Sequence, residues 1–272
     1  METCERSLAG RWALILGASS GFGAATACAL AREGMHIFGV HLDPRRSLPR
    51  AEAVMAAIEA SGSRAVFFNV NAADAQKRAR VVAAMADTLA ADHQEAVHLL
   101  VHTLAFGSLR PYVAEDASAA VSESQMEMTL RVMAHSFAYW IQDLVRAGLL
   151  RQGSRAYAIS SIGSQRATPY YGPVSAAKAA LEAHTRQLAL ELAPQGIAVN
   201  CLMPGVADTP ALRVIPGNER IVEQVLTYHP AGRLTTPEDV AQALVVLADP
   251  RLTWISGAVI PVDGGESIVG LR

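Results

Sequence analysis

Four side chains able to take part in acid–base chemistry lie within one short span, residues 160–182. The span holds a hydroxyl at Ser161, two phenols at Tyr170 and Tyr171, and an ammonium at Lys178. A phenol can donate a proton to an oxygen that gains charge, and a nearby ammonium can favour that negative charge. The span therefore indicates a site for proton donation with electrostatic support.

The spacing around the lysine predicts a helix that begins near Gly172. Pro173 suits the first helical position, where its missing N–H costs nothing. A buried stripe is predicted from residues that recur at helical spacing: Val174, Ala177, Leu181, Thr185, Leu188 and Leu192. Lys178 and Glu182 are expected to lie off this stripe. Tyr171 then stands at the mouth of the helix, two turns before Lys178, where both can share one face.

A glycine-rich turn near the start of the chain predicts a nucleotide site. It reads Gly-x-x-x-Gly-x-Gly and lies between an apolar run, residues 12–16, and a helix-like segment, residues 21–32. Glycines in this place permit a tight turn and let backbone N–H groups face a pyrophosphate. The residues expected to line the site are Gly17, Ser19, Ser20, Gly21, Phe22 and Gly23.

The elements that must position these groups follow an alternating pattern. Short apolar runs without clean alternation are separated by helix-like segments, which predicts a parallel sheet covered on both faces. The expected strands are residues 12–16, 37–40, 65–70, 97–101, 156–159, 198–203 and 258–262, and an unusually long helix is expected over 119–149. We predict one doubly wound, Rossmann-type α/β domain over residues 1–272, with about seven strands. A substrate loop is expected near 204–228, including a short helix at 219–226.

Composition narrows the functional classes. The chain is 51% hydrophobic and 18% charged, with a net charge of −2 and no basic block, so neither nucleic acid nor a membrane is an expected partner. Cys4, Cys28 and Cys201 are widely spaced and are expected to be reduced thiols. The histidines show no ligand spacing, so no metal is expected. Without a leader or a membrane-length apolar run, a soluble cytoplasmic protein is expected.

The Gly-x-x-x-Gly-x-Gly spacing resembles that of the short-chain dehydrogenase/reductase superfamily, and the resemblance covers nearly the whole chain. Asn69 and Val70 resemble the family's Asp-Val pair, which touches the adenine, with an amide in place of the acid. Pro204-Gly205 followed by Thr209 is similar to the family's Pro-Gly-x-x-x-Thr, whose threonine holds the nicotinamide carboxamide. The resemblance implies a nicotinamide cofactor.

The residues expected to be catalytic differ from those of the commonest members of that superfamily. Their catalytic tyrosine precedes the lysine by four residues, and this position holds Val174, which has no proton to donate. Tyr171 precedes Lys178 by seven residues, and Ser161 keeps the place of the usual catalytic serine. Tyr-x6-Lys resembles the branch that includes the bacterial enoyl-acyl-carrier-protein reductases, in particular the variant with ordinary cofactor motifs. The main enoyl reductase branch has a second tyrosine where Ser161 stands.

This spacing suits reduction of a conjugated C=C. Hydride then goes to the β carbon while charge appears on the thioester oxygen, two carbons away from that β carbon. In carbonyl reduction the charge instead appears on the oxygen attached to the carbon that takes the hydride, so an acid placed further from the nicotinamide suits the C=C reaction. Our hypothesis is that Tyr171 donates to the enolate oxygen, while Lys178 binds the nicotinamide ribose and favours the oxyanion. Ser161 would be a secondary donor or a wall residue. Tyr170 is the rival proton donor, because adjacent tyrosines cannot be separated by the motif.

Aromatic residues after the fourth expected strand complete the hypothesis. Phe106 and Tyr112 are expected to wall the acyl pocket together with Tyr170 and Tyr171. His102, at the end of that strand, is expected to be structural.

The second expected strand bears on the choice of cofactor. The usual acid position holds His41, and Asp43 follows two residues later with Arg45 and Arg46 just beyond. Two arginines can pair with a 2′-phosphate, whereas a displaced acid would not repel it. We predict NADP(H) ahead of NAD(H).

The favoured function is NADPH-dependent reduction of a 2-enoyl thioester, with acyl-carrier-protein conjugates ahead of coenzyme A ones. One alternative is an NADP-dependent carbonyl or alcohol oxidoreductase of the same superfamily that uses Tyr171 or Tyr170. Another is a catalytically silent, nucleotide-sensing protein, which the intact Ser161, Tyr171 and Lys178 argue against. The resemblance also implies a homotetramer.

Overall fold

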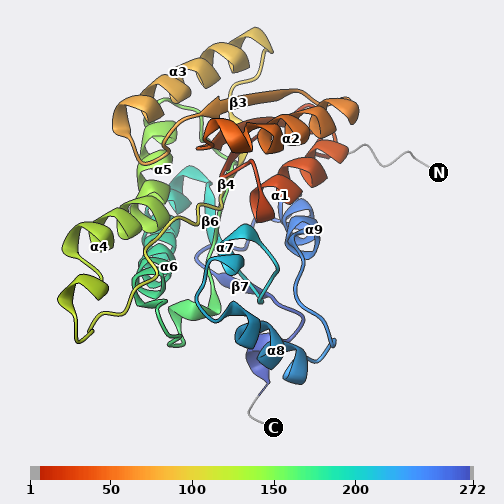
Figure 1. Ribbon diagram of the computed structural model, residues 1–272. Helices are drawn as coiled ribbons and strands as arrows, with labels where there is room; N and C mark the ends of the chain where they lie inside the picture. The colour runs from red at the N-terminus through yellow and green to blue at the C-terminus, as the bar shows by residue number, and fades with distance from the viewer. Residues whose placement is uncertain (1–6, 270–272) are drawn as a thin grey trace.

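The computed structural model describes residues 7–269, so Cys4 lies outside the described part of the chain. A seven-stranded parallel sheet forms the centre of the molecule, in the order β3-β2-β1-β4-β5-β6-β7 (Figure 1). Its strands are β1 (Trp12–Leu16), β2 (His36–His41), β3 (Ala65–Asn69), β4 (Val97–His102), β5 (Arg155–Ile159), β6 (Ala198–Pro204) and β7 (Val259–Val262). Every residue of β1, β4 and β5 is buried, as expected of strands covered on both faces. The predicted fold class is confirmed.

The helices form a layer on each face of the sheet (Figure 1). Within residues 7–269 they are α1 (Gly21–Arg32), α2 (Leu48–Ala60), α3 (Ala75–Ala91), α4 (Glu123–Leu130), α5 (Ser136–Arg146), α6 (Gly172–Leu192), α7 (Pro210–Arg213), α8 (Asn218–Tyr228) and α9 (Pro237–Leu247). Side chains of α3, α5 and α6 share one apolar core, and those of α1, α2 and α9 share the other. No helix in this range is both long and apolar enough to cross a membrane.

The long helix expected over residues 119–149 is wrong as a single element. Ser122 starts α4 with a capping box, in which its hydroxyl accepts from the Gln125 N–H while the Gln125 side chain accepts from the Ser122 N–H. A π-helical turn, Arg131–His135, then separates α4 from α5. The apolar spacing alone did not reveal either the later start or the inserted turn.

Helix α6 begins at Gly172, as predicted, but two of its polar residues were misplaced. Lys178 and Glu182 are only 5% and 7% exposed. The helix packs against β6 on one side and against α4 and the π-helical turn on another, so it buries more than one stripe. Both side chains consequently lie inside the protein, where a charged group needs a partner or a function.

Candidate active site

The predicted site residues gather at the carboxyl ends of the central strands. Strand order reverses between β1 and β4, and ligands of open α/β sheets bind in the crevice outside such a switch point. The glycine-rich turn follows β1, the span that contains Ser161 follows β5, and the Pro204-Gly205 turn ends β6. One edge of the sheet thus brings together segments that are far apart in sequence.

The turn after β1 is held in shape by a threonine that the sequence analysis did not single out. Thr103 Oγ1 donates to the carbonyl of Leu16 at 2.8 Å and contacts that of Gly17 at 3.3 Å. Gly17 has φ +95°, and a Cβ there would lie 2.5 Å from Thr103 Oγ1. A Cβ on Gly23 would lie 2.1 Å from the Gly17 carbonyl oxygen. Glycine is therefore required at both positions for this close packing.

The start of α1 is suited to an anionic group. Ser20 is the N-cap, but its side chain makes no capping bond, and the first turn carries no acid. The N–H groups there and the positive end of the helix dipole can face a phosphate. Thr209, 7% exposed, lies across from Gly21, whose Cβ would be 3.7 Å from the Thr209 methyl. These residues fit the pyrophosphate and nicotinamide portions of a dinucleotide.

The predicted adenosine end contains a carboxylate that is firmly held. Asp43 Oδ2 lies 2.8 Å from His41 Nδ1. Burial raises the pKa of Asp43, but hydrogen bonds from Ser19, His41 and Ser47 outweigh it and leave that pKa below its usual value. Asn69 fixes the same segment, because its amide accepts from the Asp43 N–H at 3.0 Å and donates to the Asp43 carbonyl at 2.9 Å. The acid is displaced in sequence, yet its carboxylate contacts the glycine-rich turn through Ser19.

The two arginines predicted to bind a phosphate lie just beyond that carboxylate. Arg45 and Arg46 are exposed in a short 3-10 turn before α2. Val70 anchors the neighbouring strand end, since its N–H donates to the His41 carbonyl at 2.8 Å. Because Arg45 and Arg46 are exposed, both are accessible to a ligand at this edge of the sheet.

The structure distinguishes the two adjacent tyrosines. Tyr171 is the N-cap of α6 and is partly buried, and a hydrogen bond links its phenol with Ser161. Burial raises the pKa of Tyr171, which the contact with Ser161 partly counteracts, so the phenol keeps its proton at neutral pH. Tyr170 is 46% exposed and has φ +63°, a left-handed conformation that is uncommon for a bulky residue. The backbone thereby turns the two side chains to different environments.

Gly163 explains how the Tyr171 ring reaches the serine. A Cβ on Gly163 would lie 2.6 Å from Tyr171 Cε1 and 3.4 Å from Ser161 Oγ. The ring therefore lies directly against the glycine α carbon. Ser161 also accepts from the Gly163 N–H at 3.1 Å, which fixes the serine side of the contact.

Lys178 is the buried cation of the site. Its Nζ donates to the Ile159 carbonyl at 2.6 Å, at the end of β5. Burial lowers the pKa of Lys178 to about 8, although Cys201 and Glu182 act in the opposite direction. The ammonium thus carries its charge at neutral pH and loses it under mildly alkaline conditions.

Glu182 joins the loop after β5 to the middle of α6. Its Oε1 accepts from the hydroxyls of Ser160 and, at 2.7 Å, of Ser164. These two serines bracket Ser161, so the carboxylate fixes the backbone that carries the predicted catalytic hydroxyl. The helical spacing had placed Glu182 off the buried stripe of this helix, whereas the carboxylate is buried. Its spacing of four residues from Lys178, one helical turn, was the available signal that it faces the same interior.

The residue four positions before Lys178, where the commonest superfamily members have their catalytic tyrosine, belongs to the apolar core. Val174 is 5% exposed, and its Cγ2 would lie 3.0 Å from a Cβ on Gly107. The other predicted wall residues lie outside this core: Phe106 is 68% exposed and Tyr112 54%. The Tyr112 ring lies against Gly172, where a Cβ would be 2.9 Å from Tyr112 Cζ. Tyr112 therefore borders the same helix start as Tyr171.

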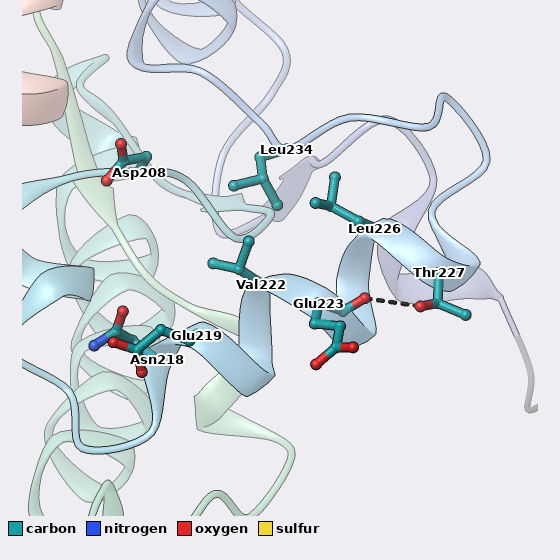
Figure 2. A pocket seen from close by; sticks show the side chains of 8 residues that line it. All are labelled: Asp208, Asn218, Glu219, Val222, Glu223, Leu226, Thr227 and Leu234. Atoms are coloured by element: carbon teal, nitrogen blue, oxygen red, sulfur yellow. Dashed lines mark hydrogen bonds between the residues drawn. The ribbon is translucent and has the colours of Figure 1, made fainter.

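A hollow of about 610 Å³ lies beside α8, in the predicted substrate loop (Figure 2). Figure 2 shows the side chains of Val222 and Leu226 extending from α8 toward the side on which Leu234 and Asp208 lie. Glu219 and Glu223 add acidic groups. Neither Tyr171 nor Lys178 lines it, so this hollow is separate from the predicted catalytic residues.

We expect Gly163→Ala to lower kcat/KM about tenfold or more, because the new methyl group must displace the Tyr171 ring and a misplaced reacting group is costly. The measurement is a comparison of initial rates with the parent protein. In a Tyr171→Phe background the same change should have little further effect, since the phenol is already lost. Equal losses in both backgrounds would contradict the assigned role of Gly163.

Known proteins resemble this chain in sequence and in fold. A family model described as enoyl-(acyl carrier protein) reductase matches residues 17–267. The human dehydrogenase/reductase SDR family member 2, mitochondrial, is 30% identical over 257 residues, covering 94% of this chain and 86% of that protein. The cis-4-hydroxycyclohexanecarboxylate dehydrogenase of Sinomonas cyclohexanicum is 30% identical over 274 residues, covering 97% and 99%. A solved enoyl-[acyl-carrier-protein] reductase (NADH) from Aquifex aeolicus VF5 shares the fold, with a TM-score of 0.84, 22% identity, and coverage of 98% and 100%.

Proposed function

Because the chain belongs to the short-chain dehydrogenase/reductase superfamily, an oxidoreductase family that binds a nicotinamide cofactor, we propose that it reduces the C=C of a 2-enoyl thioester with NADPH. The observation that carries this proposal is the position of the acid. The phenol that contacts Ser161 belongs to Tyr171. Ordinary family members have their catalytic tyrosine four residues before the lysine, and here that position is occupied by the buried Val174. The matched enoyl reductase family model supports the same reaction.

The chain's own residues have distinct tasks in this proposal. Tyr171 donates a hydrogen bond to the thioester oxygen as charge develops there, and its raised pKa keeps the proton available. Lys178, held by the Ile159 carbonyl, supplies positive charge in a site of low polarity, where charge has a strong effect. Ser161 fixes the phenol and can donate to the same oxygen.

The cofactor would be held by groups whose geometry fits it. The open N–H groups of α1 would receive the pyrophosphate, Thr209 would hold the carboxamide, and Lys178 would bind the ribose hydroxyls. The close packing of Gly17 and Gly23 keeps the floor of this cradle free of side chains. When bound, a reduced nicotinamide supplies the hydride.

We propose that NADPH is preferred over NADH, but by a modest factor. The exposed Arg45 and Arg46 favour a 2′-phosphate, while the Asp43 carboxylate, held against Ser19, repels it. Asp43→Asn is expected to raise the NADPH to NADH ratio of kcat/KM about tenfold, since one like charge is removed. Arg45→Ala with Arg46→Ala should lower that ratio by a similar factor. Steady-state rates with each cofactor provide the measurement, and an Asp43→Asn variant that favours NADH more strongly would contradict this arrangement.

A second candidate, reduction of a carbonyl or oxidation of an alcohol, is favoured by the contact between Tyr171 and Ser161. This pair resembles the serine and tyrosine of ordinary family members, and one relative at 30% identity is named as a hydroxycyclohexanecarboxylate dehydrogenase.

Purified protein with NADPH should be assayed against crotonyl thioesters of coenzyme A and of acyl carrier protein, and separately against a panel of ketones. We expect turnover of the thioesters, with the carrier-protein conjugate ahead. Activity on ketones alone would overturn the enoyl proposal in favour of the second candidate.

We also propose a homotetramer located in the cytoplasm. Support for assembly comes from large apolar side chains at the surface of α5 and α6, where Leu190 on α6 is 71% exposed and Tyr139 on α5 is 38% exposed. Light scattering coupled to size-exclusion chromatography tests this: a monomer at micromolar concentration would contradict it.

A further inference from the structure

His102 is a buried titratable side chain that the proposed mechanism does not use. It is the last residue of β4, is fully buried, and is paired in register with Ala158 on β5. Its ring packs edge-on against Phe137 at 5.6 Å between ring centroids. Burial, together with the charge of Lys178, lowers the pKa of His102 to about 3, so the imidazole is neutral at neutral pH.

The hydrogen bonds of Ser136 determine which nitrogen of His102 carries the proton. Ser136 Oγ donates its single proton to the Val132 carbonyl at 2.7 Å. The same oxygen lies 2.8 Å from His102 Nε2 and must therefore accept from it. The imidazole consequently carries its proton on Nε2 and presents Nδ1 as a bare acceptor.

That acceptor has no hydrogen-bond partner among the described residues, although it is fully buried. Buried acceptors are nearly always paired, because leaving one unpaired is costly. Val132, which fixes Ser136, belongs to the π-helical turn Arg131–His135, and such turns are frequent at functional sites. Together these features point to a ring that is held in one orientation to receive a donor.

Lys178 is the donor on the same side of the sheet. An ammonium has three N–H groups, and one of them donates to the carbonyl of Ile159, the residue that follows Ala158 on β5. The ionisable groups that influence Lys178 are Cys201 from β6 and Glu182 from its own helix. His102 approaches from β4 as a neutral group, so it adds no repulsion to the ammonium charge.

We propose that His102 is a positioning residue for Lys178: its Nδ1 accepts a hydrogen bond that originates at the ammonium and passes through one bridging water. The bond holds the lysine in its charged form and directs its remaining N–H groups toward the cofactor side. A bridging water can join a bare acceptor to a donor that makes no direct bond with it. This inference rests on the role that the proposed function gives to Lys178.

A matched pair of substitutions separates the two nitrogens of the ring. The amide of asparagine reaches the position of Nδ1, and the amide of glutamine reaches that of Nε2. His102→Asn retains the acceptor and loses the contact with Ser136, whereas His102→Gln retains that contact and loses the acceptor. If the imidazole were only structural, the glutamine variant would be the milder of the two.

The readout is the titration of Lys178 itself, measured in cofactor-free protein by NMR of lysine labelled at the ε carbon. The chain contains two lysines, Lys77 and Lys178, and Lys77 is exposed. The buried signal can therefore be assigned with a single Lys178→Met variant. We expect the pKa of Lys178 to fall by about one unit in His102→Gln, because a hydrogen bond to the charged form has been removed, and to stay within about 0.3 unit in His102→Asn.

Ser136→Ala is the second variant, should glutamine prevent folding. It removes the acceptor that fixes the proton on Nε2, so the lysine pKa should fall in the same direction as in His102→Gln. The alkaline limb of kcat/KM should move with the NMR titration. An unchanged Lys178 titration in both His102→Gln and Ser136→Ala, or a larger shift in His102→Asn than in His102→Gln, would overturn the proposal. Because the NMR measurement needs no substrate, its result is independent of whether the enoyl thioester proposal holds.

Discussion

Replacing Tyr171 with phenylalanine is expected to lower kcat/KM for an enoyl thioester by about 10²–10⁴-fold, the range that a positioned proton donor contributes. The substitution removes only the hydroxyl that contacts Ser161 and leaves the ring against Gly163. Cofactor affinity should be unchanged, because none of the groups assigned to the dinucleotide is altered. Initial rates of NADPH oxidation and a fluorescence titration of NADPH would measure the two quantities.

Tyr170→Phe provides the matched control. It removes the same atom from the adjacent residue, whose side chain is exposed and turned away by a left-handed backbone. Its kcat/KM should remain within about threefold of the parent, in line with the small effects of surface substitutions away from special features. If the Tyr170 variant loses activity and the Tyr171 variant keeps it, the proton donor has been assigned to the wrong phenol.

Lys178→Met is expected to reduce turnover about 100-fold or more. The same change should remove the free-energy cost that the buried ammonium imposes on the folded protein at neutral pH. The lysine pKa is about 8 in the folded protein against the ordinary 10.5. This difference corresponds to a free-energy cost of about 3 kcal/mol for keeping the buried group charged at pH 7. Methionine has no such cost, although it loses the bond to the Ile159 carbonyl.

The sign of the pH dependence follows from proton binding. Between pH 8 and 10.5 the unfolded chain binds more protons at Lys178 than the folded protein, so this group makes the free energy of unfolding rise with pH in that window. Below pH 8 the full cost is present. The difference in unfolding free energy between Lys178→Met and the parent should thus shift by about 3 kcal/mol in favour of the parent from pH 7 to 10.5. Urea unfolding at both pH values measures it, and a difference that stays constant would show that the ammonium is not desolvated.

The pH dependence of kcat/KM provides an independent test of the ionisation of Lys178. In the parent protein kcat/KM for the cofactor should decline above about pH 8, because this quantity reports the ionisation of the free enzyme and the neutral amine no longer supplies charge.

The sheet and the start of α6 were predictable from the sequence because their signals are local. Apolar runs define the strands, and Pro173 defines the first turn of the helix. The π-helical turn was not predictable, since it depends on how α4 and α5 pack against α6. Burial of Lys178 and Glu182 was missed for a related reason: periodicity describes one face of a helix, whereas this helix is covered on several.

The site shows the same division between local and long-range information. The glycine spacing predicted a tight turn, but the hydroxyl that fixes it comes from Thr103, which lies 87 residues after Leu16. The acid at the second strand looked displaced in sequence, and only the folded chain brings the Asp43 carboxylate back to Ser19. The choice between Tyr170 and Tyr171 required backbone geometry, because two adjacent residues of one type carry no difference in composition.

Glu182 and the two serines that donate to it, Ser160 and Ser164, form a serine clamp that affects how new substrate specificities can arise in this protein. Ser160 and Ser164 tie the catalytic loop to the interior of α6, whereas Phe106 and Tyr112 stand on a separate, exposed loop after β4. Substitutions at the most exposed positions of that loop can reshape the wall of the pocket while the reacting groups keep their arrangement. Libraries for directed evolution should therefore vary Phe106 and Val113 and leave the serine clamp and Gly107 intact, because a Cβ on Gly107 would lie 3.0 Å from Val174 Cγ2.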